Sequence, residues 1–364
     1  AHRTFEWTSE APLKAAVHCV IVGFTKRQGG CRLFDYVSVR SAPNELATGF
    51  INAYLVDGPN VLVEKRMKPL SPSLPEIESG SKAVDWGYLT IEEGEIDEVR
   101  ADPVAKKYIR PYLGGDELIN NIARWCLWLE ELDPKDIRKS KLLADRVAEV
   151  QSKRAASKKA PTRAISSTPH LFGERRQPST AYLGIPQTFS ESRRYATAAR
   201  LPKTTIASIK LFTAPDQDGY LFAIISSSMF IVWQKTVGGR LKSDPSFSNT
   251  LVWNNLPLPL VGDGLRSRII AAGQAILEAR ESYPQRSLAE HYNPLSMDAG
   301  LVAAHDNLDR LVDSAFGAKR TCASVRERQN ILFARYQEMT DPLGVSAEPK
   351  ATRTRRTSKG SKGK

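Results

Sequence analysis

One segment restricts the fold more than any other. Residues 15–24 read AAVHCVIVGF, an unbroken apolar and β-branched run that is typical of a strand buried on both faces of a sheet. Leu33 to Val39 is its expected neighbour, joined through a turn at Gln28-Gly29-Gly30. No βα units precede these strands, and the chain opens without an initiator Met, so we expect the last strands of an α/β sheet in the back half of a longer protein. The apolar surface of Val17 to Phe24 should then be uncovered and the isolated chain poorly soluble.

The middle of the chain mixes helical and strand-like patterns. Asp116 to Glu131 carries Trp and Leu at helical spacing and is expected to be a helix whose stripe belongs to the core. Asp133-Pro134 is a favourable helix start, and that helix should run to about Lys159. Thr204 to Phe212 and Tyr220 to Val232 are predicted strands.

Amphipathic helices dominate after Gly262. Apolar residues recur at helical spacing from Leu265 to Ile276, from Leu301 to Phe316 and from Ser324 to Met339, and Gly317 suits the position just beyond a helix end. These segments predict a small helical bundle. The fold class is therefore α+β, with the final residues disordered because they lack apolar anchors.

The charge is unevenly distributed along the chain. The formal net charge is +12, and the tail after Glu348 alone contributes seven Lys or Arg and no acid. Lys135 to Arg176 holds twelve basic and four acidic residues, whereas Leu74 to Asp102 holds two basic and nine acidic ones. This asymmetry favours a polyanionic partner on one face, although solvated helices and a disordered tail explain each run separately.

The cysteines and the apolar runs indicate in which cellular compartment the protein is expected. Four scattered cysteines form no CxxC pair and have no histidine at ligand spacing, which argues against a zinc site or disulfide framework and favours the cytoplasm. No apolar run reaches the length of a membrane span, so no membrane partner is expected.

Catalytic signatures are missing from the sequence. There is no GxGxxG, P-loop, HExxH or GxSxG motif. The acidic pair that Pro215-Asp216 begins has no Glu-x-Lys partner, and isolated histidines such as His18 and His305 fit satisfied core or interface positions better than acid–base roles. We expect no catalytic, cofactor-binding or metal-binding residue in this chain.

Two polar segments are better candidates for a binding site. SESRRY places Arg193 and Arg194 beside Tyr195, a combination suited to clamping phosphates. After Trp233, an expected packing anchor, a Gly-Gly turn should deliver Arg240, Lys242, Ser243 and Asp244, whose donors and acceptors match base edges in the major groove. A plain surface hairpin, and an internal pair between Glu191 and one arginine, are the structural alternatives.

Several blocks in order resemble one family. AHRTFEWTSEAPLKAAVHCVIVGF, NAYLVDGPNVLVEKRMKPLS, IARWCLWLEEL, SESRRY and GGRLKSDPSFSNTLVWNNLPLP are similar to the C-terminal half of MmeI-like DNA methyltransferases, the type IIL restriction–modification enzymes and their relatives. The similarity extends from His2 to about Thr340 and leaves out only the basic tail.

The resemblance implies a division of labour. It implies the end of an S-adenosylmethionine-dependent methyltransferase domain in residues 1–65, a DNA target recognition domain in 66–260, a C-terminal helical domain in 261–342 and a disordered basic tail in 343–364. Family members methylate the amine of a flipped adenine. The family's cofactor loop and NPP[YF] motif lie upstream and are absent here, so S-adenosylmethionine is implied only for the full-length enzyme and this chain is not expected to be active alone.

The partners implied are double-stranded DNA and the missing N-terminal methyltransferase portion, to which a nuclease is attached in some members. Two alternatives stay open. In the first, the chain is a stand-alone specificity or scaffold subunit that binds a separate catalytic chain. In the second, it binds RNA or polyanions generally, although an RNP-type aromatic strand is lacking.

Overall fold

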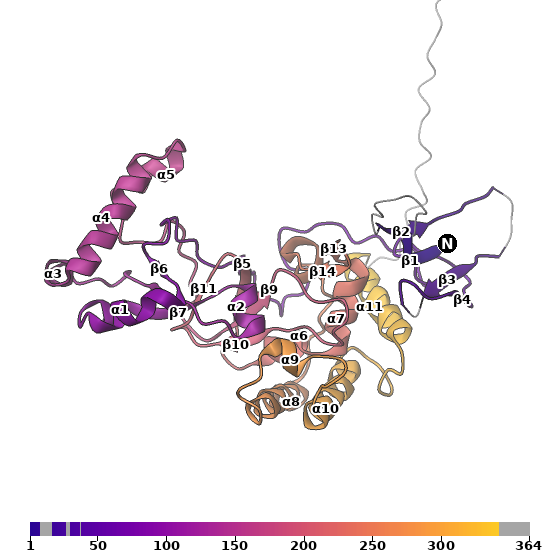
Figure 1. The fold of residues 1–364 in the computed structure, drawn as a ribbon. Coiled ribbons are helices and arrows are strands. Elements are labelled where there is room, and N and C mark those ends of the chain that lie inside the picture. Colours follow the sequence, from indigo (N-terminus) through magenta and orange to yellow (C-terminus); the bar gives the residue numbers. More distant parts are fainter. Residues whose placement is uncertain (8–16, 27–29, 37, 342–364) are drawn as a thin grey trace, which may run out of the picture.

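The computed structural model of the chain describes residues 1–7, 17–26, 30–36 and 38–341. It contains four small sheets and a group of helices at the C-terminal end, which confirms the expected α+β class (Figure 1). The expected disordered tail and the Gln28-Gly29 part of the predicted turn lie outside the described residues. Among the residues described, no helix combines the length and apolar character needed to cross a bilayer.

The N-terminal sheet has the order β2-β1-β3-β4. Its strands are β1 (His2–Trp7), β2 (Val17–Ile21), β3 (Leu33–Tyr36) and β4 (Pro43–Leu46). The prediction that the two apolar strands are neighbours was wrong, because β1 inserts between them, antiparallel to β2 and parallel to β3. The prediction of a strand buried on both faces was also wrong, since most of β2 is exposed. The apolar surface of residues 17–24 is uncovered as expected, with Val22 58% and Phe24 97% exposed.

Two further four-stranded sheets form the middle of the chain. One has the antiparallel order β10-β9-β12-β5, and the other has the order β11-β7-β8-β6, in which β11 and β7 are parallel. Their strands are β5 (Glu78–Ser79), β6 (Thr90–Ile91), β7 (Ile109–Leu113), β8 (Trp125–Leu127), β9 (Tyr182–Pro186), β10 (Ala199–Leu201), β11 (Ile206–Ala207) and β12 (Leu211–Pro215). The strand predicted over Thr204 to Phe212 is thus split between the two sheets.

The second of these sheets belongs to a lobe with its own core, built from Ala83 to Phe172 together with Ile206. The lobe includes η1 (Glu93–Glu95), α1 (Ile96–Ala101), η2 (Ala105–Tyr108), α3 (Pro134–Lys139), α4 (Lys141–Ala155) and α5 (Ala160–Ala164). Asp133 caps α3 as predicted, accepting a bond from the amide of Lys135 at 2.9 Å. The helix does not continue to Lys159, because Ser140 is extended and starts α4 as a new N-cap, with its Oγ accepting from the amide of Leu143.

Two more helix and strand predictions were wrong. The helix predicted over Asp116 to Glu131 ends early, because α2 (Gly115–Asn120) stops at Asn121, which is left-handed, and the chain continues as β8. The predicted core stripe was Leu118, Ile122, Trp125 and Leu129. Its core role is confirmed for Leu129, which is buried, and in part for Leu118 and Trp125, which are partly buried against the cores, but it was wrong for Ile122, which is 50% exposed because the helix ends before it.

The strand predicted over Tyr220 to Val232 is two helices, α6 (Tyr220–Ile225) and α7 (Ser228–Val237). Every residue of α6 and most of α7 are buried. A helix that is apolar on all sides has no periodicity to separate it from a buried strand. The helix starts come from local bonds: Asp216 accepts from the amides of Leu221 and Phe222, and Ser227 caps α7.

The largest core joins this central segment to the C-terminal helices. It includes Trp233 and Trp253 together with Leu308 and Phe333. The helices are α8 (Asp263–Glu281), α9 (Leu288–His291), α10 (Ala299–Ala315) and α11 (Val325–Thr340). The predicted helices and the role of Gly317, with φ +97°, are confirmed. A buried ion pair between Arg328 and Asp313 ties α11 to α10.

Candidate nucleic-acid interface

A short hairpin presents the second predicted polar segment. Strands β13 (Gly239–Leu241) and β14 (Asp244–Ser246) pair antiparallel, and Leu241 opposite Asp244 is the last pair before the turn. The reversal therefore lies at Lys242-Ser243 and not at the Gly-Gly pair, because Gly238 closes the end of α7. Lys242 has a φ of +57°, a left-handed conformation that costs a residue with a side chain about 1–2 kcal/mol. It is exposed at the tip of the hairpin.

The hairpin is fastened to the loop that carries the first predicted segment. The amide of Phe189 donates to the carbonyl of Pro245 at 2.9 Å, and the amide of Phe247 donates to the carbonyl of Gln187 at 2.9 Å. The side chain of Asp244 accepts from the amide of Glu191 at 2.9 Å. The structure therefore brings together the two segments that the sequence offered separately.

Arg240 has a supporting position within this arrangement. Its Nη1 donates to the carbonyl of Ser243 at 2.8 Å, across the turn, and to Oε1 of Glu191 at 3.3 Å. The alternative of an internal pair is thus realised, but Glu191 pairs with an arginine of the hairpin and not with one of its neighbours. Lys242 forms no hydrogen bond or ion pair in the part of the chain that the structure describes, which leaves its ammonium group available to a ligand.

The two adjacent arginines have different surroundings. Arg193 is half-buried, and burial lowers the pKa of its guanidinium while nearby Asp244 opposes that effect. Arg194 is exposed, pairs with Asp306 of α10 at 2.8 Å and lies over the ring of Tyr195. The two guanidinium groups do not form a joint fork, since Nη1 of Arg193 donates to Oγ1 of Thr197 at 3.5 Å, whereas Arg194 pairs with α10.

Lys235 organises the loop, and sequence reasoning missed it. It lies near the end of α7, and its Nζ donates to the backbone carbonyls of Glu191 and Arg193, both at 3.0 Å. Burial lowers the pKa of Lys235, the charge of Arg240 lowers it further and Glu191 opposes both. The sequence did contain one signal for this role, because a single cation within an apolar segment needs hydrogen-bond partners when that segment is buried.

The C-terminal helices support the same loop from behind. His305 of α10 stacks on Tyr195 and bonds to the hydroxyl of Tyr292 at 2.8 Å and to the carbonyl of Ser226 at 3.0 Å. Arg280 of α8 donates to the same hydroxyl and to the carbonyl of Ala198. The expectation that His305 is a satisfied core residue is confirmed. Trp233 is the expected packing anchor, with its Nε1 donating to the carbonyl of Val252 at 2.9 Å.

Comparison with known families classifies the chain. Residues 57–260 match the family described as MmeI, target recognition domain, and residues 261–344 match the family described as MmeI, C-terminal domain. The first match alone covers more than half of the chain. The chain belongs to the MmeI family.

Two relatives extend this classification to most of the chain. DNA methyltransferase A of Bacillus subtilis (strain 168) is 33% identical over 342 residues, which are 94% of this chain and 38% of that protein. A solved structure of the type IIL restriction–modification enzyme MmeI in complex with DNA is 39% identical, with a TM-score of 0.81, over 93% of this chain and 45% of that one. The chain thus spans less than half the length of these MmeI-family relatives.

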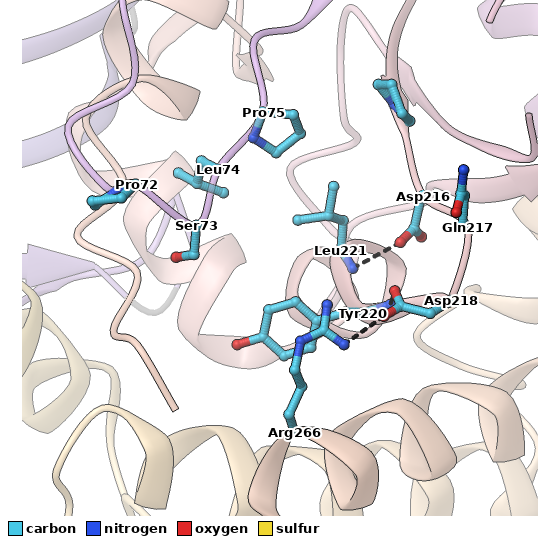
Figure 2. Close-up of a pocket in the computed structure, with 11 residues that line it drawn as sticks. Pro72, Ser73, Leu74, Pro75, Asp216, Gln217, Asp218, Tyr220, Leu221 and Arg266 are labelled. Atoms are coloured by element: carbon cyan, nitrogen blue, oxygen red, sulfur yellow. Dashed lines mark hydrogen bonds and ion pairs between the residues drawn. The ribbon is translucent and has the colours of Figure 1, made fainter. Parts of the chain in front are cut away.

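A pocket elsewhere in the MmeI-family chain contains the acidic pair noted in the sequence. Its volume is about 370 Å³, and it lies between Pro72–Pro75 and the start of α6 (Figure 2). Both carboxylate oxygens of Asp216 accept helix amides, at 3.1 and 3.0 Å, and Asp218 pairs with Arg266. Burial raises the pKa of Asp216, which the two amide bonds only partly offset. These carboxylates therefore serve as a helix cap and as an ion-pair partner.

The turn between β12 and α6 does not offer a binding loop for S-adenosylmethionine either. The β12–α6 connection is a glycine-containing strand-to-helix turn, but Asp216 already occupies the amides at the helix start that an anionic ligand would need. Within the described ranges there is no group of three His, Cys, Asp or Glu side chains that could hold a metal ion. His18 is exposed on β2, which corrects its expected core position.

Proposed function

We propose that this chain is the sequence-reading portion of an adenine-specific DNA methyltransferase that acts in restriction–modification or phage defence. The observation that carries the proposal is the exposed Lys242, held in a left-handed turn on a hairpin that is fastened to an arginine-containing loop. Strained backbone at an exposed tip is characteristic of functional sites. Membership of the MmeI family, and the relatives' names, supply the methyltransferase context.

In this proposal the six polar residues have different roles. Lys242, Ser243 and Asp244 enter the major groove, where a lysine donates to guanine and a carboxylate accepts from cytosine. Arg240 stiffens the turn and also contacts a base or phosphate, while Arg193 and Arg194 hold the DNA backbone. S-adenosylmethionine is bound by the methyltransferase portion of the enzyme, not by residues of this chain.

The proposed domain organisation is the one that the family resemblance implies: the end of the methyltransferase domain in 1–65, the recognition domain in 66–260, the helical domain in 261–342 and a basic tail in 343–364. The uncovered apolar strand β2 supports a catalytic portion packed on the N-terminal sheet. Four unpaired cysteines support a cytoplasmic location, where the DNA is reached.

Selection from a randomised duplex library tests the proposal directly. The protein, reconstituted with its methyltransferase portion, should enrich one sequence, and Lys242→Gly should relax the preference at one position while leaving stability unchanged or higher, because glycine accepts a positive φ. Lys319→Ala, an exposed lysine between α10 and α11, is the matched control and should leave the preference intact. If the unaltered protein enriches no duplex sequence, the reading function is wrong.

Salt dependence supplies a second measurement. If about six phosphates are neutralised, the logarithm of the binding constant should fall against the logarithm of salt concentration with a slope near −5. Equal or tighter binding of structured RNA would favour general polyanion binding.

An alternative arrangement follows from β2. Its exposed apolar side chains are equally suited to a catalytic chain encoded separately, in which case this protein is a specificity subunit. Co-purification with a separate methyltransferase subunit would support that arrangement. An in-frame coding sequence immediately upstream of Ala1 would exclude it.

A further inference from the structure

A second basic surface lies far from the hairpin. Helices α3, α4 and α5, residues 134–164, form what we call the basic arm, which projects from the lobe that contains β6–β8 (Figure 1). Its exposed cations are Lys135, Arg138, Lys139, Lys141, Lys153, Lys158, Lys159 and Arg163. Helix α4 has 15 residues and is about 22 Å long, which is enough to follow roughly six base pairs of a duplex.

The outer end of the basic arm is purely cationic. No acidic residue occurs between Glu149 and Glu174. In the described part of the chain, Lys153, Lys158 and Lys159 have no carboxylate at ion-pair distance, whereas Lys141 at the inner end faces Asp145. The same lobe carries exposed acids on α1, Asp97 and Glu98, so its charge is polarised. A polarised surface of this kind attracts a polyanion to one side only.

Hydrogen bonds of a buried arginine hold this outer end of the basic arm in place. Arg154 is fully buried and donates to five backbone carbonyls, those of Ala83, Val84, Ile165, Thr168 and Leu171. These bonds tie the last turn of α4 to the body of the lobe and to the segment after α5.

Arg163 fixes the turn between α4 and α5. Its Nη1 donates to the carbonyls of Ser157 and Lys158, at 2.8 and 2.9 Å. The turn that carries Lys158 and Lys159 is therefore held in place before any partner arrives, which lowers the entropic cost of binding.

The basic arm and the hairpin lie on the same side of the molecule. In Figure 1, α4 and α5 rise on the side of the molecule away from α8 and α10, and β13–β14 lies on that same side. We propose that the outer end of the basic arm, Lys153, Lys158 and Lys159, is a second contact surface for the phosphate backbone of duplex DNA, flanking the site that the hairpin reads. This inference rests on the proposed DNA-reading function.

The test compares two triple variants of the protein reconstituted with its methyltransferase portion. One is Lys153→Ala, Lys158→Ala and Lys159→Ala, which leaves Arg154 and Arg163 in place. The control, Lys106→Ala, Lys203→Ala and Lys319→Ala, removes the same charge from exposed lysines outside the basic arm. Both are measured by fluorescence anisotropy on the selected duplex and on a scrambled one, over a range of salt concentrations, and thermal melting confirms that each is folded.

The arm variant should reduce the magnitude of the salt slope by about three, one unit for each phosphate that is no longer neutralised, and should weaken both duplexes by the same factor. Its hydroxyl-radical footprint should shorten on one flank of the selected site. An unchanged slope and footprint, or an equal reduction in the control, would overturn the basic arm as a contact surface. A reduction seen with structured RNA but not with duplex DNA would also overturn it.

The two proposals fail in different ways. If the unaltered protein shows no preference between the duplexes, the reading function fails, whatever the basic arm does. If the preference is present and depends on Lys242 but the arm variant binds as the control does, only the second surface fails.

Discussion

The imidazole of His305 stacks on the ring of Tyr195, with ring centroids 3.8 Å apart and planes inclined by 16°. The two residues belong to different segments, α10 and the loop of Arg193 and Arg194. The C-terminal helices therefore do more than cover the core, because they support the loop that we propose holds DNA. His305 is fully buried, and its Nδ1 donates to the carbonyl of Ser226 while its Nε2 accepts from Tyr292.

This burial predicts a pH dependence of stability. Burial and the charge of Arg280 hold the pKa of His305 well below its usual 6.5. Below pH 6.5 the unfolded chain takes up a proton that the folded chain does not, so His305 makes the free energy of unfolding fall by up to about 1.4 kcal/mol per pH unit. His305→Gln should remove this contribution, measured as a shallower loss of stability between pH 6.5 and 5 in urea unfolding. Parallel pH profiles for the two proteins would contradict it.

Replacing Lys235 should lower both the stability of the protein and its affinity for duplex DNA. Lys235→Met keeps the apolar stem but leaves two carbonyls without their donor, which should lower the free energy of unfolding by about 1–3 kcal/mol. The released loop should also weaken duplex binding. Lys235→Arg restores a charged donor and should recover part of both losses. Loss of stability with duplex affinity unchanged would show that the loop does not depend on this lysine for binding.

Arg154 is expected to be the most sensitive polar residue of the lobe. Arg154→Met removes donors to five carbonyls and should cost about 3–5 kcal/mol, the range seen when buried charged networks lose one partner. Arg154→Lys cannot reproduce the guanidinium fork and should recover little. Hydrogen exchange should show faster exchange in residues 141–171 and little change in α8 and α10. A uniform change across the chain would argue against a separately organised lobe.

Two glycines of α8 form a matched pair. A Cβ at Gly273 would lie 2.7 Å from the Cβ of Ala223 on α6, so Gly273→Ala should overpack this contact and cost about 1–3 kcal/mol. Gly264 of the same helix has open space, and Gly264→Ala should stabilise the helix by about 0.5–1 kcal/mol. Thermal melting of the two variants should therefore shift in opposite directions. Shifts of the same sign would show that helix propensity outweighs the close contact.

Substitution of Arg240 distinguishes a contact with a base from a contact with the DNA backbone. Arg240→Ala should cost about 1–3 kcal/mol of duplex binding and relax the preference at one position if its guanidinium contacts a base. Equal weakening of all duplexes would make it a backbone contact. Glu191→Ala removes its ion-pair partner and should change stability by no more than about 1 kcal/mol, because the pair is partly exposed.

Local sequence determined the features that depend on near neighbours. The cap at Asp133, the helices after Gly262 and the end at Gly317 were all predictable, because capping and amphipathic periodicity act within one or two turns. The polar composition of the two binding segments was equally visible in the sequence.

Only the tertiary structure decided which segments meet. The uniformly apolar segment of α6 and α7 contains no periodicity, so its helical state depends on how the surrounding core packs against it on all sides, whereas the local caps Asp216 and Ser227 set only where each helix begins. Glu191 and Arg240 are 49 residues apart, and no local rule places them in contact. The residue that anchors the loop, Lys235, has a role only because folding brings two carbonyls to its ammonium group. Long-range packing fixes such positions, since the free energy that holds them comes from a shared core and not from the chain near each residue.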